Sequence, residues 1–133
     1  RVLIALALEP SRPQTIGALA RVFRVSRNHL VKVVNKLVAT GYARSIRGRS
    51  GGVLLDTPSD EIRIGDVVAA FEPSMRIISC LECPLDGTCS LVTVFDRGIR
   101  AFLDELNRHT VDDLIADRRG LYQRLDLERD RAS

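Results

Sequence analysis

The chain has 133 residues, of which 45% are hydrophobic, and this fits one globular domain with at most a short additional arm. No apolar run approaches the roughly 18 residues of a membrane-spanning helix, and the short apolar start lacks the cleavage pattern of a signal peptide. The net charge is +3, and three cysteines without a secretion signal predict a reducing, cytoplasmic environment rather than a disulfide framework.

Taken in chain order, the first elements are helices. The chain begins at Arg1 rather than at Met, so we expect further residues to precede it and residues 1–8 to be the second half of a buried helix. Apolar residues spaced three and four apart predict helices over 16–23 and 27–39, because that spacing puts them on one helix face. Thr15 and Ser26 precede these two helices as N-caps.

A basic hairpin is predicted next. Gly41 suits the left-handed position that ends a helix. Strands are expected over 42–47 and 53–55, joined by a glycine-rich turn at 48–52. Two helices separated by a short turn and followed by a hairpin are the order of a winged helix-turn-helix. The predicted fold is therefore mainly α with a small β-hairpin wing.

The second half of the chain reads as a separate arm. A linker starts at Pro58, and helices are expected over 64–71, over 90–108 and, after a capping box at Thr110, up to Tyr122. We expect a DNA-binding domain over 1–58, a short helix and cysteine loop over 59–89, a dimerisation helix and C-terminal helix over 90–125, and a charged tail over 126–133. The candidate dimerisation residues are Leu91, Phe95, Ile99, Phe102 and Leu106.

Charge divides the chain in the same place. Residues 10–55 hold nine lysines and arginines and no acid, whereas from Asp56 onward 16 acidic residues outnumber 10 basic ones. A solvated basic face is one explanation. A run of 46 residues without an acid favours a polyanion-binding domain joined to a partner-binding or sensing part.

The second predicted helix opens with side chains that can read bases. Arg27 suits guanine and Asn28 suits adenine, while His29 can donate to a base or to phosphate or can be a structural histidine. Later lysines and the arginines beside the wing glycines suit phosphates and a narrow minor groove. A solvated helix face and a nucleotide-binding loop are the alternatives. The candidate DNA-contacting residues are Ser26, Arg27, Asn28, His29, Lys32, Lys36, Arg47 and Arg49.

The three cysteines form a Cys-x2-Cys-x5-Cys segment, Cys80, Cys83 and Cys89. Thiolates select zinc, copper(I) or iron–sulfur clusters, and the close spacing favours one shared metal or cluster over unligated redox cysteines. Because the chain has no fourth cysteine, a fourth ligand must be a carboxylate such as Glu82 or Asp86 or come from elsewhere. Iron–sulfur is the preferred interpretation, with zinc and redox cysteines as alternatives.

Together these features resemble the NsrR and IscR family of bacterial iron–sulfur regulators, and the NsrR branch most closely. The resemblance covers nearly the whole chain. It is carried by Val25–Lys32, Gly41-Tyr42, Arg47-Gly48-x-x-Gly51-Gly52-x-x-Leu55, Ile62–Val68, the cysteine segment and Phe102-Leu103-x-x-Leu106.

The resemblance implies a homodimeric, cytoplasmic repressor that binds a palindromic operator in double-stranded DNA. It further implies that the three cysteines bind a [4Fe-4S] cluster, with [2Fe-2S] as the alternative, and that nitric oxide releases the DNA. In the NsrR branch an aspartate near the N-terminus of the other subunit can be the fourth ligand. The IscR branch uses a histidine three residues after its last cysteine, where this chain has Val92.

Three functions remain at this point. The first is a repressor that senses nitric oxide, and the second is a regulator of the same kind that senses iron or cluster supply. The third, from another class, is a zinc-stabilised interaction module or a small electron carrier. No catalytic dyad or triad is recognisable, so we do not expect an enzyme.

Overall fold

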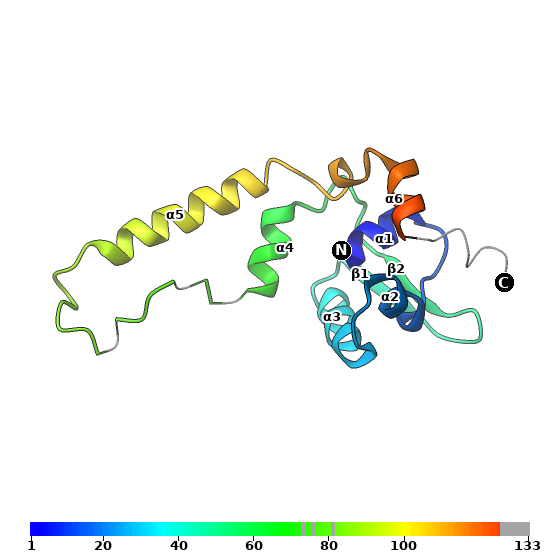
Figure 1. Cartoon of the computed structure of the whole chain (residues 1–133), viewed down its shortest axis with the longest axis horizontal. Coiled ribbons are helices and arrows are strands. Elements are labelled where there is room, and N and C mark those ends of the chain that lie inside the picture. The colour runs from blue at the N-terminus through cyan, green and yellow to red at the C-terminus, as the bar shows by residue number, and fades with distance from the viewer. Residues whose placement is uncertain (73, 76, 81, 126–133) are drawn as a thin grey trace. The chain divides into compact units, whose positions relative to one another are not determined.

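The computed structural model describes residues 1–72, 74–75, 77–80 and 82–125 (Figure 1), so the predicted charged tail lies outside the described residues. The chain folds as two compact units, Arg1–Ile62 together with the segment from Thr110 onward, and Arg63–His109. The elements in chain order are α1 (Val2–Leu8), α2 (Ile16–Phe23), α3 (Arg27–Ala39), β1 (Ala43–Ile46), β2 (Gly52–Leu55), α4 (Ile64–Phe71), α5 (Leu91–Leu106), the 3₁₀ helix η1 (Asp113–Ile115) and α6 (Arg118–Leu125).

Helix α1 lies in the core of the first unit. Six of its seven residues are buried, and Leu6 and Leu8 are almost completely inaccessible. A helix that is apolar on every side is stable only when neighbours cover all of it. Here β2 and η1 pack against α1, which confirms the expectation of a buried helix at the start of the chain.

Helices α2 and α3 form the helix-turn-helix, with the bounds that the sequence predicts. Both expected caps are present: the Thr15 hydroxyl accepts a hydrogen bond from the Ala18 N–H at 3.1 Å, and the Ser26 hydroxyl accepts one from the His29 N–H at 3.1 Å. Between them, Arg24 ends α2 in a left-handed conformation. The inner face of α3 is buried at Leu30, Val34 and Leu37.

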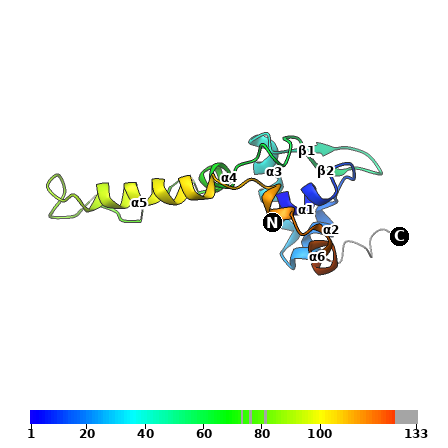
Figure 2. The same cartoon turned by 90° about the horizontal axis from the view of Figure 1, so that it is seen from above.

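The wing is a two-stranded antiparallel hairpin, seen from above in Figure 2, and its strand ends differ by one residue from the prediction. The backbone of Gln14 extends it, since the N–H groups of Gln14 and Val53 each donate to the other's carbonyl at 2.9 Å. A Cβ on Gly52 would lie 2.7 Å from the Gln14 carbonyl oxygen, and Gly48 has a φ of +109°. These glycines are therefore required by the hairpin itself.

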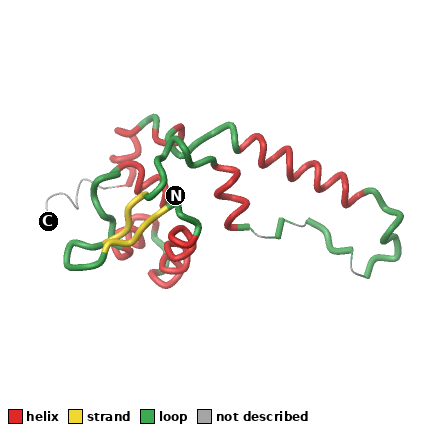
Figure 3. The backbone as a smooth tube through the Cα atoms, turned by 180° about the vertical axis from the view of Figure 1, so that it is seen from behind, coloured by secondary structure: helices red, strands yellow, loops and turns green. Residues whose placement is uncertain are grey.

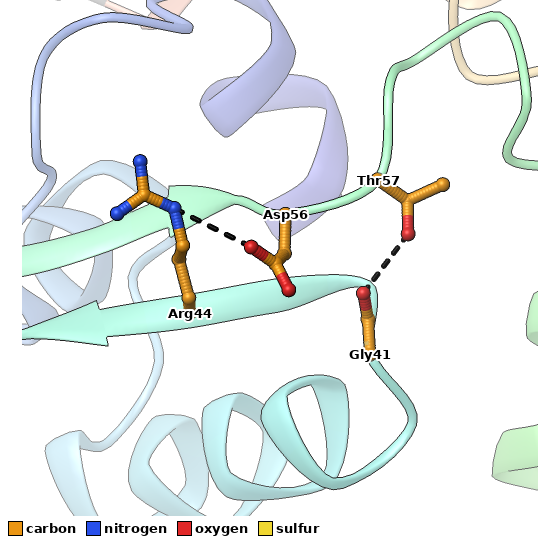
Figure 4. A network of polar contacts seen from close by, with 4 residues as sticks. All are labelled: Gly41, Arg44, Asp56 and Thr57. Atoms are coloured by element: carbon orange, nitrogen blue, oxygen red, sulfur yellow. Dashed lines mark hydrogen bonds and ion pairs between the residues drawn. The ribbon is translucent and has the colours of Figure 1, made fainter.

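Two contacts lie at the base of the wing, where β1 begins and β2 ends (Figure 4). The Arg44 guanidinium forms an ion pair with Asp56 across the hairpin, with 3.4 Å between Nε and Oδ1. The Thr57 hydroxyl donates to the carbonyl of Gly41 at 2.9 Å, and Gly41 has the left-handed φ expected of a residue that ends a helix. The wing is thus attached to the end of α3.

The C-terminal segment returns to α1. The expected capping box is formed, because the Thr110 N–H donates to Asp113 and the Asp113 N–H donates to the Thr110 hydroxyl. Arg118 Nη2 and the Tyr122 hydroxyl then donate to the Leu8 carbonyl oxygen, at 2.7 and 2.6 Å. From the sequence, residues 90–125 were expected to form one region with the long helix. In the structure, the segment from Thr110 onward belongs to the compact unit that contains the wing.

The second unit consists of α4, the cysteine loop and α5 (Figure 3). The Asn107 side chain accepts a hydrogen bond from the Asp66 N–H at 2.9 Å and donates to the Asp66 carboxylate at 3.0 Å. Gly65 permits this contact, since a Cβ there would lie 2.5 Å from the Leu103 carbonyl oxygen. Helix α4 is therefore held against the C-terminal half of α5.

Helix α5 is amphipathic and has no buried residue. Its apolar side chains include Leu91, Val94 and Phe102, which are 47%, 52% and 52% exposed. Within the described residues, no helix is both long enough and apolar enough to cross a membrane.

Candidate functional site

The first turn of α3 presents the predicted base-reading side chains. Arg27, Asn28 and His29 are all exposed, and the Ser26 cap holds the backbone on which they stand. The opposite face of the helix is anchored in the core through Leu30. A capped and anchored helix start that projects three polar side chains has the form of a recognition helix.

The remaining predicted DNA contacts have different degrees of exposure. Lys32 is exposed on the second turn of α3, whereas Lys36 is half-buried on the last turn and already interacts with another group of the protein. In the wing, Arg47 and Arg49 are both exposed beside Gly48. These side chains belong to the same unit as the recognition helix and can supply positive charge to a phosphate backbone.

One basic residue of the acid-free segment is already paired. Arg44 forms its ion pair with Asp56, the first acid after that segment. Both side chains are about half exposed, so the pair contributes little to stability. It does neutralise one positive charge near the wing.

The three cysteines lie in one loop between α4 and α5. Successive turns shape the loop, with the Cys83 N–H donating to the Cys80 carbonyl at 3.1 Å and the Cys89 N–H donating to the Leu85 carbonyl at 3.0 Å. Cys80 and Cys83 are half-buried, Cys89 is exposed, and no disulfide joins the three. Among the described residues, no group of three or more His, Cys, Asp or Glu side chains is arranged so that it could hold a metal ion.

The chemistry of the loop nevertheless fits an iron–sulfur cluster or zinc. All three candidate ligands are thiols, which are soft donors once ionised. The Leu91 N–H, at the start of α5, donates to the Cys89 sulfur at 3.4 Å. Such N–H···S hydrogen bonds are among the contacts that tune the reduction potential of protein-bound clusters.

A cavity of about 290 Å³ lies between the cysteine loop and α5. Cys80, Asp86 and Asp96 bring polar groups to its wall, and most of the rest is apolar. Sequence reasoning named Asp86 but not Asp96, which lies seven residues beyond the last cysteine. The sequence does contain an indication of Asp96: it is an acidic residue one helical turn after Val92, on a side of α5 that is otherwise apolar.

The predicted dimerisation residues lie along α5 with varied exposure. Leu91 and Phe102 are exposed, and Phe95, Ile99 and Leu106 are half-buried. Ile99 and Phe102 also line an open apolar groove of about 450 Å³ formed with Met75 and Ile77. An amphipathic helix with exposed large apolar side chains is typical of an interface.

Comparison with known proteins gives a consistent family. The model of the Rrf2 family, described as an iron-dependent transcriptional regulator, matches residues 1–117. Among solved structures, CymR of B. subtilis, described as the global cysteine regulator, is 27% identical, with a TM-score of 0.69 over 85% of this chain and 86% of that one. The oxidized form of Staphylococcus aureus CymR is 26% identical (TM-score 0.68, 86% and 87% covered). IscR of T. potens is 20% identical (TM-score 0.68, 86% and 78% covered).

Proposed function

The chain belongs to the Rrf2 family of DNA-binding transcriptional regulators, which are not enzymes, and we propose that it is a homodimeric repressor that releases its operator in response to nitric oxide. The observation that carries DNA recognition is the start of α3, where the Ser26 cap presents exposed Arg27 and Asn28. Arg and Asn are the side chains that bind guanine and adenine edges bidentately. The exposed wing arginines would contact the flanking backbone or minor groove.

Sensing is proposed for the cysteine loop. Cys80, Cys83 and Cys89 would hold an iron–sulfur cluster, with [4Fe-4S] preferred to [2Fe-2S]. When bound, such a cluster supplies iron that reacts with nitric oxide. The chain's own contribution is to hold three thiolates in one loop that joins α4 to α5. The resemblance of the chain to the NsrR branch, which covers nearly its whole length, supports nitric oxide as the signal.

A second candidate keeps the DNA binding but makes iron or cluster supply the signal. The description of the family model as an iron-dependent regulator favours it. Both candidates use the same cysteines and the same recognition helix. They are distinguished by which promoters the protein binds and by whether nitric oxide weakens its binding to operator DNA. A zinc-stabilised module would use the same thiols as ligands. It would be colourless and would bind operator and random DNA equally well.

The experiment that tests the proposal combines absorption with DNA binding. Anaerobically purified protein, with any residues that precede Arg1 included, should be brown and should bind operator tightly. Added nitric oxide should bleach the visible absorption and weaken operator binding together. Bleaching without loss of binding would refute the proposed signal, and colourless zinc-containing protein would favour the zinc module.

Recognition by α3 can be tested by substituting Arg27. Because Arg27 is exposed on the first turn, we expect Arg27→Ala to reduce the preference for operator over random DNA by about 1–3 kcal/mol. Lys32→Ala, one turn further along, should weaken binding to both DNAs about equally and reduce the salt dependence. Fluorescence anisotropy at several salt concentrations measures both effects. Unchanged discrimination by Arg27→Ala would mean that α3 does not read bases.

A further inference from the structure

The ion pair at the base of the wing follows from the register of the hairpin. Arg44 on β1 is paired with Leu54 on β2. Asp56 lies just beyond β2, opposite Tyr42, whose carbonyl accepts a hydrogen bond from the Asp56 N–H at 3.0 Å. Residues two apart on a strand point to the same side, so Arg44 and Asp56 are diagonal neighbours on one side of the hairpin. Their side chains point toward one another, with 3.4 Å between Nε and Oδ1 (Figure 4).

Asp56 stands at the end of the acid-free segment. Residues 10–55 contain nine lysines and arginines and no acid, so their charges add to one positive field. Arg47 and Arg49 beside the wing glycines are exposed, as is Arg27 at the start of α3. A cation that reaches a DNA phosphate releases counterions whatever the sequence of that DNA. Asp56 is thus the first acid after a segment suited to sequence-independent binding, and it pairs with one of the cations of that segment.

Stability does not account for the pair. Both side chains are about half exposed, 53% for Arg44 and 50% for Asp56, and ion pairs of that exposure contribute little to folding. Other contacts hold the same part of the wing, namely the pairing of β1 with β2 and the hydrogen bond from the Thr57 hydroxyl to the Gly41 carbonyl. The main effect of the pair is therefore electrostatic, because it gives a carboxylate partner to a guanidinium that could otherwise bind phosphate.

We propose that Asp56 limits the sequence-independent part of DNA binding by holding Arg44 away from the phosphate backbone. The inference rests on the proposed function, since it assumes that α3 and the wing bind DNA. Arg44 and Asp56 together carry no net charge, so the wing contacts DNA through Arg47 and Arg49 without a contribution from Arg44.

A limit on sequence-independent binding matters for a regulator that has to release its operator. When base contacts are lost or misaligned, the binding that remains is the sequence-independent part. Each additional phosphate contact would raise this remaining affinity and retain the protein on DNA of any sequence. Asp56 lowers the remaining affinity by the contribution of one arginine.

The test compares wild type with Asp56→Asn and Asp60→Asn, each prepared anaerobically as the full chain. Asp60 is exposed in the same segment and forms no ion pair among the described residues, so its replacement changes the net charge equally without releasing a cation. Fluorescence anisotropy measures binding to operator and to a random duplex of equal length over about 50–200 mM salt. We expect Asp56→Asn to bind both duplexes about three- to tenfold more tightly, with a slope of log affinity against log salt steeper by about 0.9. Asp60→Asn should differ little from wild type.

Adding Arg44→Gln to Asp56→Asn shows whether Arg44 carries the gain in affinity. This double variant should return to the affinity and salt slope of wild type, because the released guanidinium is absent. Circular dichroism and thermal unfolding verify that every variant folds. The inference is wrong if Asp56→Asn binds no more tightly than wild type, if Asp60→Asn shows an equal gain, or if the double variant keeps the gain. The proposed function stands in each of these cases. If wild type binds neither duplex, the proposed function fails and the inference fails with it.

Discussion

Replacement of Phe102 by aspartate is expected to convert the protein into monomers. Phe102 is 52% exposed on an amphipathic helix, so a second copy of the chain would bury it against the same helix of its partner. A carboxylate at that position would have to be desolvated without a partner charge, at a cost of several kcal/mol. Sedimentation velocity measures the result directly.

Operator affinity should decrease with the dimer. Two winged domains that bind half-sites together gain about 10²–10⁴ in apparent affinity over one, so monomers should bind the operator more weakly by a factor in that range. Thr93→Asp adds the same charge on the opposite side of α5 and serves as the control, which should remain dimeric. Dimers of unchanged stability for Phe102→Asp would show that α5 is not the interface.

Replacement of Cys83 by alanine is expected to abolish both the cluster and tight operator binding while leaving the fold intact. Cys83 is the middle cysteine of a loop that makes its own backbone turns, and the thiol lies outside the buried core. The variant should therefore retain the far-ultraviolet circular dichroism and the sedimentation coefficient of wild type. Its operator affinity should fall by about 5–150-fold, the usual range for coupling between two sites.

The proposed coupling follows from where the loop lies in the chain. It joins α4, which follows the wing, to α5, which carries the proposed dimer face. The two recognition helices of a dimer must lie about 34–36 Å apart, or a multiple of that distance, to bind both half-sites. A change in the conformation of the loop would alter this distance and therefore the affinity of the dimer for the operator. Ser90→Ala is the matched control, because Ser90 precedes α5 without forming a side-chain cap. Wild-type affinity in a cluster-free Cys83→Ala protein would indicate a purely structural metal site.

Local features of the first unit could be predicted from the sequence. Thr15 and Ser26 act as caps, and Gly41 ends α3, because each depends on a hydrogen bond or a dihedral angle within a few residues. The buried face of α3 likewise follows from a spacing of three and four residues. The proposed recognition residues belong to this class, since they are defined by their place at the start of a capped helix.

The cysteine spacing indicated the kind of ligand but not its surroundings. Three thiols within ten residues favour an iron–sulfur cluster or zinc over unligated redox cysteines whatever the fold. That Cys80 and Asp96 line one cavity depends on how the loop packs against α5, because the two residues are 16 positions apart in the chain. No local pattern encodes that arrangement.

Other features were decided by the tertiary structure alone. The C-terminal segment returns to α1 because Arg118 and Tyr122 supply donors to the Leu8 carbonyl, which α1 leaves without a partner at its end. Gly52 is required because the Gln14 backbone approaches it, 38 residues away in the sequence. Such contacts join residues of large sequence separation. Periodicity and propensity report only on neighbours within a few turns, whereas these pairings depend on how complete elements pack.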